Sequence, residues 1–555
     1  MELLKYKNLL FEITPAKGTL LAIVSFMTLE TVLSLITPWL AGQFTHAVLS
    51  PSSSPTLTYQ QILLLWLFLL ALQAVISFFY GYLSGTTSQR MLTGLRVRLY
   101  DHLQALPMNY FHEHKHGNTL ALLTNDAAII SDFVTNTLLG LLPLLLTVCG
   151  ALLCIFLITP LVAVLAGLLI PLFFLTTKLL GRRIRPLSRQ MIQLYSDTLS
   201  IAEENLATLP VIKSFTREIR ESQRFEEKNA RLLLVTAAYL RIQSLLSPLI
   251  KFVATGIILF ILWLISGDLS SGGLTPADIV KLLLYGMMMT QPVSRLANVY
   301  GQIQRAIGAS EHLLEVFSLT PESPSAGIEL PFVKGDITYQ DIHFRYPGRR
   351  PLLQGLNLAI KAGETVAVIG ENGAGKTTLA HLLMRFADPD SGRVYIDGND
   401  IRTVSLVSLR RQIGIVQQQV LLQNSTVADN IRFGCPGASQ EQIELAARNA
   451  HALDFITKLP KGFSTIIGDQ GVRLSGGQKQ RLSLARALIK DPAILILDEA
   501  TAMFDPEGEQ FFIRECRDIL QNKTVILITH RPGSLLLADR IVQLTDGHIR
   551  EKTGE

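Results

Sequence analysis

Thr365-Val366-Ala367-Val368-Ile369 leads directly into Gly370-Glu371-Asn372-Gly373-Ala374-Gly375-Lys376-Thr377, and these residues indicate the fold of the C-terminal part of this chain. The first five residues predict a buried β-strand, and the apolar run that begins at Thr378 predicts a helix. A glycine-rich G-x4-G-K-T loop between a strand and a helix is a phosphate-binding loop, because its backbone N–H groups converge on phosphate oxygens. We expect Lys376 to reach the β- and γ-phosphates and the Thr377 hydroxyl to ligate Mg²⁺.

A second apolar strand, Ile494-Leu495-Ile496-Leu497, ends in Asp498-Glu499. Acids at the carboxyl end of a strand lie near the phosphates in a doubly wound sheet. Asp498 is therefore expected in the magnesium shell, and Glu499 is expected to orient and deprotonate the attacking water. The alternative is that Glu499 is an ordinary acid at a helix N-terminus, which the phosphate loop disfavours.

The composition places the rest of the chain in a membrane. The 555 residues exceed one ordinary domain, and only 17% are charged while 48% are hydrophobic. Soluble domains carry roughly 25% charged residues, so a disordered chain is excluded and an ordinary soluble enzyme is disfavoured. A net charge of +5 is too weak to predict a nucleic-acid partner. The four cysteines show no metal-ligand or disulfide spacing and are predicted to be reduced.

Residues 1–300 contain six apolar runs, each close to the roughly 20 residues that cross a bilayer as helix: 19–43, 61–85, 137–158, 161–180, 244–266 and 277–300. Thr159-Pro160 joins the third and fourth runs, which favours a tight helical hairpin over one broken helix. We predict an α-helical membrane domain with six transmembrane helices at 1–317, a linker at 318–335, and an α/β P-loop nucleotide-binding domain at 336–555.

Lys and Arg are concentrated in the segments 86–135 and 178–243 and are absent from 44–60 and 267–280. By the positive-inside rule both termini are cytoplasmic. The two basic segments are amphipathic and long, so the transmembrane helices are expected to extend far into the cytoplasm. The first run is too long for a signal peptide and is expected to remain as an anchor. These features predict a multi-pass integral membrane protein.

Leu474-Ser475-Gly476-Gly477-Gln478 opens another helix and is a second candidate anion site. A chain with two such sites and one phosphate loop suggests that the second site binds nucleotide held elsewhere. The order of phosphate loop, Gln418, LSGGQ, ILILDEA and His530 resembles that of the ATP-binding-cassette (ABC) transporters. With six spans on its N-terminal side, the chain resembles a half-transporter of the type IV exporter fold.

The resemblance implies roles for further residues. Tyr346 resembles the aromatic residue that stacks on adenine, Gln418 the glutamine that reaches Mg²⁺, and His530 the histidine at the γ-phosphate. Ser475, Gly476, Gly477 and Gln478, with Asp505, resemble the residues that contact nucleotide across a dimer. The loop Ala502-Met503-Phe504-Asp505 departs from the usual Ser-Ala-Leu-Asp, which puts communication across the dimer in doubt.

The resemblance implies ATP-driven transport of an amphipathic or hydrophobic substrate, with export favoured, by a dimer that uses ATP and Mg²⁺. The complete set of catalytic residues favours a homodimer, and a heterodimer stays open, as does the choice among small-molecule, lipid and peptide substrates. Two alternatives remain: an importer of siderophore type on the same fold, and a non-pumping, nucleotide-gated partner subunit. The intact Glu499 and His530 argue against the second.

Two charges lie inside predicted spans, Glu30 in the first and Lys251 in the fifth. A charge within the bilayer is costly and normally faces a partner or a cavity. Since both lie at similar depth from the cytoplasmic side, a structural ion pair is the favoured hypothesis. A lysine that snorkels to the interface or a polar group lining the substrate cavity is the alternative.

Overall fold

The computed structural model describes residues 17–49, 58–114, 116–270, 274–330, 333–468, 471–500, 509–510, 513–514, 517 and 519–552. The chain divides into two compact units, which we describe separately. Unit 1 comprises residues 1–101 and 120–318, and unit 2 comprises residues 102–119 and 319–555. The predicted domain bounds at 317 and 336 stay a prediction.

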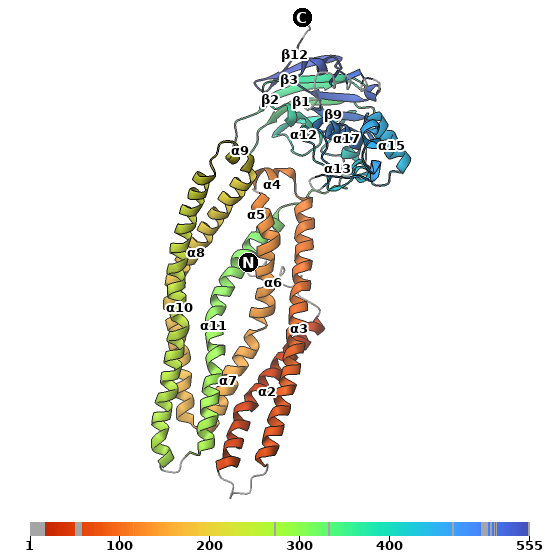
Figure 1. The fold of residues 1–555 in the computed structure, drawn as a ribbon. Helices are drawn as coiled ribbons and strands as arrows, with labels where there is room; N and C mark the ends of the chain where they lie inside the picture. The colour runs from red at the N-terminus through yellow and green to blue at the C-terminus, as the bar shows by residue number, and fades with distance from the viewer. Residues whose placement is uncertain are drawn as a thin grey trace. The chain divides into compact units, whose positions relative to one another are not determined.

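Unit 1 is built from long helices that run beside one another (Figure 1). The six long ones are α2 (Lys17–Leu49), α3 (Tyr59–Ala105), α7 (Leu141–Ile158), α8 (Pro160–Ala207), α10 (Glu218–Ser270) and α11 (Pro276–Ser318). Shorter helical pieces lie between them in the chain: α4 (Met108–Glu113), which belongs to unit 2, α5 (His116–Ala121), which begins in unit 2, and then η1 (Leu122–Asp126), α6 (Ala127–Asp132), η2 (Phe133–Leu138) and α9 (Leu209–Ser214).

The predicted hairpin between the third and fourth spans is confirmed. Helix α7 ends at Ile158, Thr159 is extended with φ −147° and ψ 107°, and α8 starts at Pro160. Proline suits the first turn of a helix because its missing N–H would have no partner there. The predicted extension of the helices beyond the apolar runs is also confirmed, since α3, α8 and α10 continue through the basic segments.

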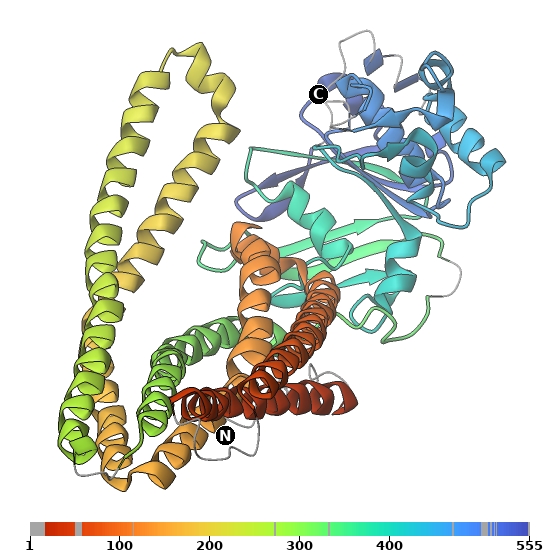
Figure 2. The same ribbon diagram turned by 60° about the horizontal axis from the view of Figure 1, so that its bottom comes forward.

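Helices α2, α7 and α11 form the packed centre of unit 1. Val148, Ile155 and Leu282 are buried in one apolar cluster, and the Tyr285 hydroxyl donates to the Leu35 carbonyl at 3.0 Å, which ties α11 to α2. By contrast, α8 and α10 pair mainly with each other, and Figure 2 shows them as a hairpin closed by α9. Their exposed faces are therefore available to another partner.

Three described stretches are long and apolar enough to cross a membrane, Lys17–Leu49, Tyr59–Ala105 and Thr119–Ile158. The full count of six spans stays a prediction. Among the described cysteines, Cys149, Cys154 and Cys435 are free thiols, as predicted; Cys516 lies outside the described residues.

The hypothesis of a Glu30–Lys251 pair is not tested, because the Lys251 side chain lies outside the described part of the structure. Glu30 and Arg295 both lie within electrostatic range of the Tyr80 hydroxyl, so α2, α3 and α11 each contribute a polar group there. Arg295 is therefore a second candidate counter-charge for Glu30.

Unit 2 contains two large sheets. An antiparallel sheet has the order β2-β1-β4-β5, and a second sheet has the order β12-β11-β3-β10-β9-β6, parallel except for β12. A short pair joins β7 to β8. The strands are β1 (Ile337–Phe344), β2 (Leu353–Ile360), β3 (Thr365–Gly370), β4 (Ser391–Ile396), β5 (Asn399–Asp400), β6 (Ile413–Val416), β7 (Ser425–Thr426), β8 (Ile466–Ile467), β9 (Ile494–Asp498), β10 (Thr524–Ile528), β11 (Arg540–Thr545) and β12 (His548–Glu551).

The helices of unit 2 cover the parallel sheet, whose central strands β9 and β10 are buried along their whole length. Strands covered on both faces are continuous apolar runs, which is why the sequence pattern identified them. The helices are α12 (Lys376–Leu383), α13 (Leu406–Gln412), α14 (Val427–Arg432), α15 (Gln440–Asn449), α16 (Leu453–Thr457), η3 (Gly462–Ser464), α17 (Gly476–Leu488) and α19 (Pro532–Leu535). The predicted α/β fold of the nucleotide domain is confirmed.

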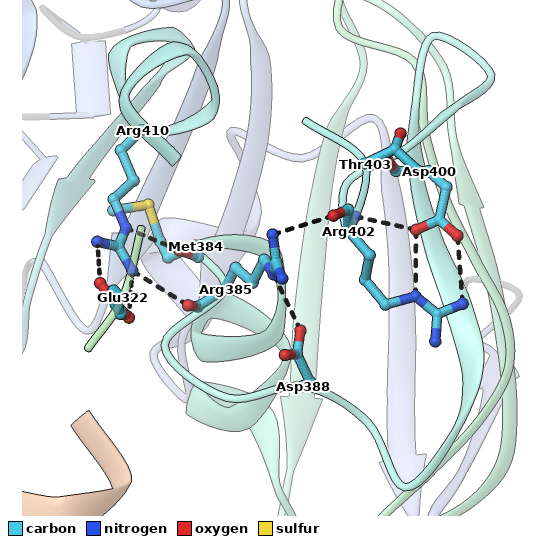
Figure 3. Close-up of polar contacts among 8 residues, drawn as sticks. All are labelled: Glu322, Met384, Arg385, Asp388, Asp400, Arg402, Thr403 and Arg410. Carbon is cyan, nitrogen blue, oxygen red and sulfur yellow. Dashed lines mark hydrogen bonds and ion pairs between the residues drawn. The ribbon is translucent and has the colours of Figure 1, made fainter. Parts of the chain in front are cut away.

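The linker is held against unit 2 through Glu322. Its carboxylate accepts two hydrogen bonds from the Arg410 guanidinium, at 2.9 and 3.1 Å, and its N–H donates to the Ala105 carbonyl at 2.7 Å. Arg410 also donates to the carbonyls of Met384 and Arg385, at 3.2 and 3.1 Å, as Figure 3 shows. Glu322 thus joins the end of α3 to α13, since its N–H contacts Ala105 and its carboxylate contacts Arg410.

Arg540, the first residue of β11, forms ion pairs with two glutamates of unit 2. Its guanidinium donates to Glu364 at 2.6 Å and to Glu551 at 2.7 Å. Burial raises the pKa of Glu364, but the hydrogen bonds from Arg540 and from the Lys361 N–H outweigh burial and hold this pKa below its ordinary value of 4.5. Glu364 is therefore ionised in the folded chain over the whole neutral range.

We expect Arg540→Met to lower stability by about 1–3 kcal/mol at neutral pH, the usual loss for hydrogen bonds to a charged group. The pKa of Glu364 is lower in the folded chain than in the unfolded chain. The stabilisation that the ionised Glu364 gives to the fold is therefore complete above the unfolded pKa and disappears as pH falls through the folded pKa. The gap in melting temperature between parent and Arg540→Met should therefore close below about pH 4.5. Arg550→Met, at an exposed position on β12, is the control; a pH-independent Arg540→Met gap contradicts the assignment.

Candidate nucleotide site

The phosphate loop lies at the carboxyl end of the parallel sheet. It follows β3 directly and leads into α12, as the sequence predicted. Gly370 has φ +155°, and a Cβ there would lie 2.5 Å from the Leu544 carbonyl oxygen of β11, so a larger residue would clash. Gly375 caps the start of α12 with φ +106°, a conformation that favours glycine. The loop therefore needs glycine at both positions.

Lys376 lies at the centre of this loop and is only 8% exposed. Its ammonium donates to the carbonyls of Gly370 and Glu371, at 2.8 and 2.9 Å. These contacts hold a positive charge where backbone N–H groups converge at the N-terminus of α12. The arrangement is that of an anion site.

Asp498 and Thr377 form the next part of the site. The Thr377 hydroxyl donates to the Asp498 carboxylate at 2.9 Å. Burial raises the pKa of Asp498, and the neighbouring Glu499 charge acts in the same direction, while the hydrogen bond from Thr377 and the charge of Lys376 oppose the rise. A cation at this point would favour the ionised carboxylate. The two oxygen donors are the type that Mg²⁺ prefers, so these residues fit that metal.

Glu499 is the centre of a cluster of three polar side chains. The Gln418 amide donates to one carboxylate oxygen at 2.5 Å, and His530 Nδ1 lies 3.2 Å from the other. Gln418 follows β6 and His530 follows β10, both strands of the same parallel sheet. In sequence, Gln418 is 81 positions and His530 is 31 positions from Glu499. The three side chains meet at one edge of the sheet because neighbouring parallel strands end there.

Tyr346 lies beside the start of α12. Its hydroxyl is 3.3 Å from the Thr378 hydroxyl, and its ring packs edge-on against Phe344 with centroids 4.9 Å apart. The aromatic residue predicted to stack on adenine is therefore next to the phosphate loop.

The LSGGQ residues serve a different helix. Ser475 caps α17, accepting a hydrogen bond from the Gln478 N–H, while the Gln478 side chain accepts one from the Ser475 N–H. Gly476 and Gly477 form the first turn. Within the part of the chain that the structure describes, no hydrogen bond joins Ser475–Gln478 to the phosphate loop. Asp505 lies outside the described residues.

Sequence reasoning missed one polar residue at this cluster, Gln480. It is 1% exposed, and its amide donates to the Glu499 carbonyl at 3.3 Å. Nothing in the local pattern marks it, because a glutamine two residues after LSGGQ resembles a surface residue of a polar helix.

Comparison with known proteins identifies the family. The model of the ABC transporter transmembrane region matches residues 20–293, and that of the ABC transporter matches residues 353–502. An ATP-dependent lipid A-core flippase of Syntrophus aciditrophicus is 36% identical over 478 residues, which cover 86% of this chain and 79% of that protein. The chain belongs to the ABC transporter family. The flippase of the same name from Escherichia coli K12 is 32% identical over 486 residues, 87% of this chain and 84% of the relative.

A solved structure of a bacterial Atm1-family ABC exporter with ATP bound has the same fold, with a TM-score of 0.84. The two sequences are 27% identical, and the match covers 96% of this chain and 94% of the exporter chain. The predicted half-transporter of exporter fold is confirmed. This ABC transporter is an integral membrane protein that couples ATP hydrolysis to transport, and its family works as dimers.

Proposed function

We propose that this ABC transporter exports an amphipathic lipid, as the name of its relatives, the ATP-dependent lipid A-core flippases, suggests. Two copies would form the pump in a bacterial inner membrane, with both termini in the cytoplasm. The observation that carries the ATP-driven part of the proposal is the cluster of Gln418, Glu499 and His530 beside the Thr377–Asp498 pair. A degenerate, non-pumping subunit has no need of this complete set.

The nucleotide roles that the family resemblance implies are part of this proposal, and the positions of the side chains support them. Lys376 would leave the loop carbonyls to contact the β- and γ-phosphates, and Tyr346 would stack on adenine. Thr377, Gln418 and Asp498 would hold Mg²⁺, which when bound neutralises charge between the phosphates. Glu499 would accept the proton of the attacking water, with His530 holding the γ-phosphate.

The loop residues Gly370, Glu371, Asn372, Gly373, Ala374 and Gly375 would cradle the phosphates with Thr378. Ser475 is exposed at the N-terminus of α17, so it can meet the nucleotide of a second chain together with Gly476, Gly477 and Gln478. Asp505 would act at the same interface. The intact site in each copy favours a homodimer.

The splayed α8–α10 hairpin supports the dimer. Its closed end exposes apolar side chains, among them Leu206, Val211, Phe215 and Ile219, which are 55–77% exposed. Exposed apolar residues that gather at one place mark an interaction surface. A second copy would cover them.

Vesicle reconstitution tests the proposed function. The purified chain is placed in phospholipid vesicles with a labelled lipid that carries a phosphorylated oligosaccharide head, and movement between leaflets is followed with ATP·Mg²⁺ and without it. We expect ATP-dependent movement of this lipid and stimulation of ATPase by it. Uptake of an iron–siderophore complex instead would favour the importer, and unstimulated hydrolysis without movement would favour the non-pumping subunit.

Phe215 provides a test of coupling between the membrane half and the nucleotide half. It follows α9 at the closed end of the hairpin and is 69% exposed. We predict that it contacts a nucleotide domain near Gln418. Phe215→Ala should then lower lipid movement by about tenfold while basal ATPase falls less than about twofold, because burial of an aromatic ring contributes about 1.5–3 kcal/mol to such a contact.

The control is Tyr195→Ala, which removes an exposed aromatic ring from the interior of α8, away from the closed end of the hairpin. It should leave the ratio of transport to hydrolysis unchanged. Equal loss of both activities in Phe215→Ala would assign Phe215 to folding.

A further inference from the structure

Glu499 is held in an unfavourable backbone conformation. Its φ is +48°, in the left-handed region that residues with a Cβ rarely adopt. Such a conformation is strained and persists only when its surroundings determine it. The main chain of Glu499 therefore needs partners that hold both its N–H and its carbonyl.

Those partners come from two elements. The Glu499 N–H donates to the Ile528 carbonyl at the end of β10, at 2.9 Å. The Glu499 carbonyl accepts from the Gln480 amide, at 3.3 Å, and Gln480 belongs to α17. With the side-chain contacts to Gln418 and His530, this makes four points of attachment.

Gln480 has a buried side-chain amide, and the described hydrogen bond of that amide is the one to the Glu499 carbonyl. It is 1% exposed, and its Oε1 has no hydrogen-bond partner within the described chain. A buried amide with an unpaired oxygen is costly, so a purely structural position would favour an apolar residue. The orientation of the amide follows from chemistry, because a carbonyl oxygen only accepts and Nε2 must face it.

Helix α17 connects this contact to the LSGGQ residues. Ser475 at its N-terminus is exposed, and Gln480 is buried five residues later, about 7.5 Å along the helix axis. Helix α17 is continuous from Gly476 to Leu488, so the LSGGQ residues and Gln480 belong to one element. Gln480 joins that element to the Glu499 carbonyl.

We infer that Gln480 is a positioning residue for Glu499, and that it links the LSGGQ surface of a chain to the general base of that same chain. The inference rests on the proposed function, in which LSGGQ binds the nucleotide of the second copy while Glu499 acts as the general base for the chain's own nucleotide. Contact between LSGGQ and the nucleotide of the second copy would thus set the orientation of the Glu499 carboxylate at the chain's own nucleotide.

The first measurement compares kcat with the KM for ATP in the full-length protein. Gln480→Met keeps the volume and removes the donor, and we expect kcat to fall by about ten- to a hundredfold, the cost of misplacing a catalytic group. The KM should change less than about twofold, because no group that binds nucleotide is altered. Gln440→Met, at an exposed position of α15, is the control and should keep the parent kcat. If Gln480→Met does not fold, Gln480→Leu replaces it.

Mixed dimers, purified through two different tags, separate the two ways in which Gln480 can act. The reference dimer pairs a parent chain with a Glu499→Gln chain and has one working base. In the first test dimer, Gln480→Met is in the chain with the working base. In the second, it is in the chain that carries Glu499→Gln.

We expect the first test dimer to lose the reference rate and the second to keep it. The reverse pattern would mean that Gln480 only shapes LSGGQ for the nucleotide across the interface, and would overturn the inference. Equal loss in both dimers, or loss in neither, would also overturn it. If a Glu499→Gln homodimer retains the parent turnover, the proposed role of Glu499 fails first and the inference falls with it.

Discussion

Glu499→Gln should bind ATP as tightly as the parent and hydrolyse it at less than about a tenth of the parent rate, since general-base catalysis contributes at least that factor. The amide occupies the same volume but does not take a proton from the attacking water. Gln418 and His530, which contact the carboxylate at 2.5 and 3.2 Å, remain in place. The loss should therefore appear in kcat and leave nucleotide affinity unchanged.

The measurement is phosphate release with magnesium present, read beside retention of labelled ATP on the purified dimer. Retained nucleotide without release indicates a closed dimer trapped before hydrolysis. Glu441→Gln, at an exposed position in the first turn of α15, controls for the loss of one carboxylate. Turnover above about a tenth of the parent rate would remove Glu499 from the role of base.

Arg410→Met should lower the melting temperature of the nucleotide domain by roughly 4–12 °C, from a loss of about 2–3 kcal/mol. The guanidinium makes two hydrogen bonds to Glu322 and two to the carbonyls of Met384 and Arg385. Both members of the ion pair are largely buried, 27% and 19% exposed. Without Arg410, the largely buried Glu322 carboxylate is left without its counter-charge.

Arg411→Met is the matched control, since Arg411 is the next residue of α13 and is exposed. Glu322→Gln combined with Arg410→Met should cost less than the sum of the two single changes, because the pair is lost only once. Protease should also cut the linker faster in Arg410→Met than in the parent. Additive effects, or an Arg411→Met loss of the same size, would contradict a specific linker contact.

The site was predictable wherever chemistry and local pattern coincide. The phosphate loop was recognised because its glycines, lysine and threonine are adjacent and lie between a strand and a helix. Asp498 and Glu499 were found because they end a run of four apolar residues. These features depend on near neighbours in the chain, and the tertiary structure leaves them as the pattern predicts.

Local sequence patterns were enough to predict a membrane half and a nucleotide half, the phosphate loop, and the strand that carries Asp498 and Glu499, because periodicity and glycine content are local properties. The folded structure was needed to find that the Gln418 amide and His530 meet the Glu499 carboxylate, that Gln480 contacts the Glu499 backbone, and that Arg410 binds Glu322. Each of these contacts joins residues 19 to 88 positions apart. Their geometry follows from strand order and from packing between elements, which no short stretch of sequence encodes.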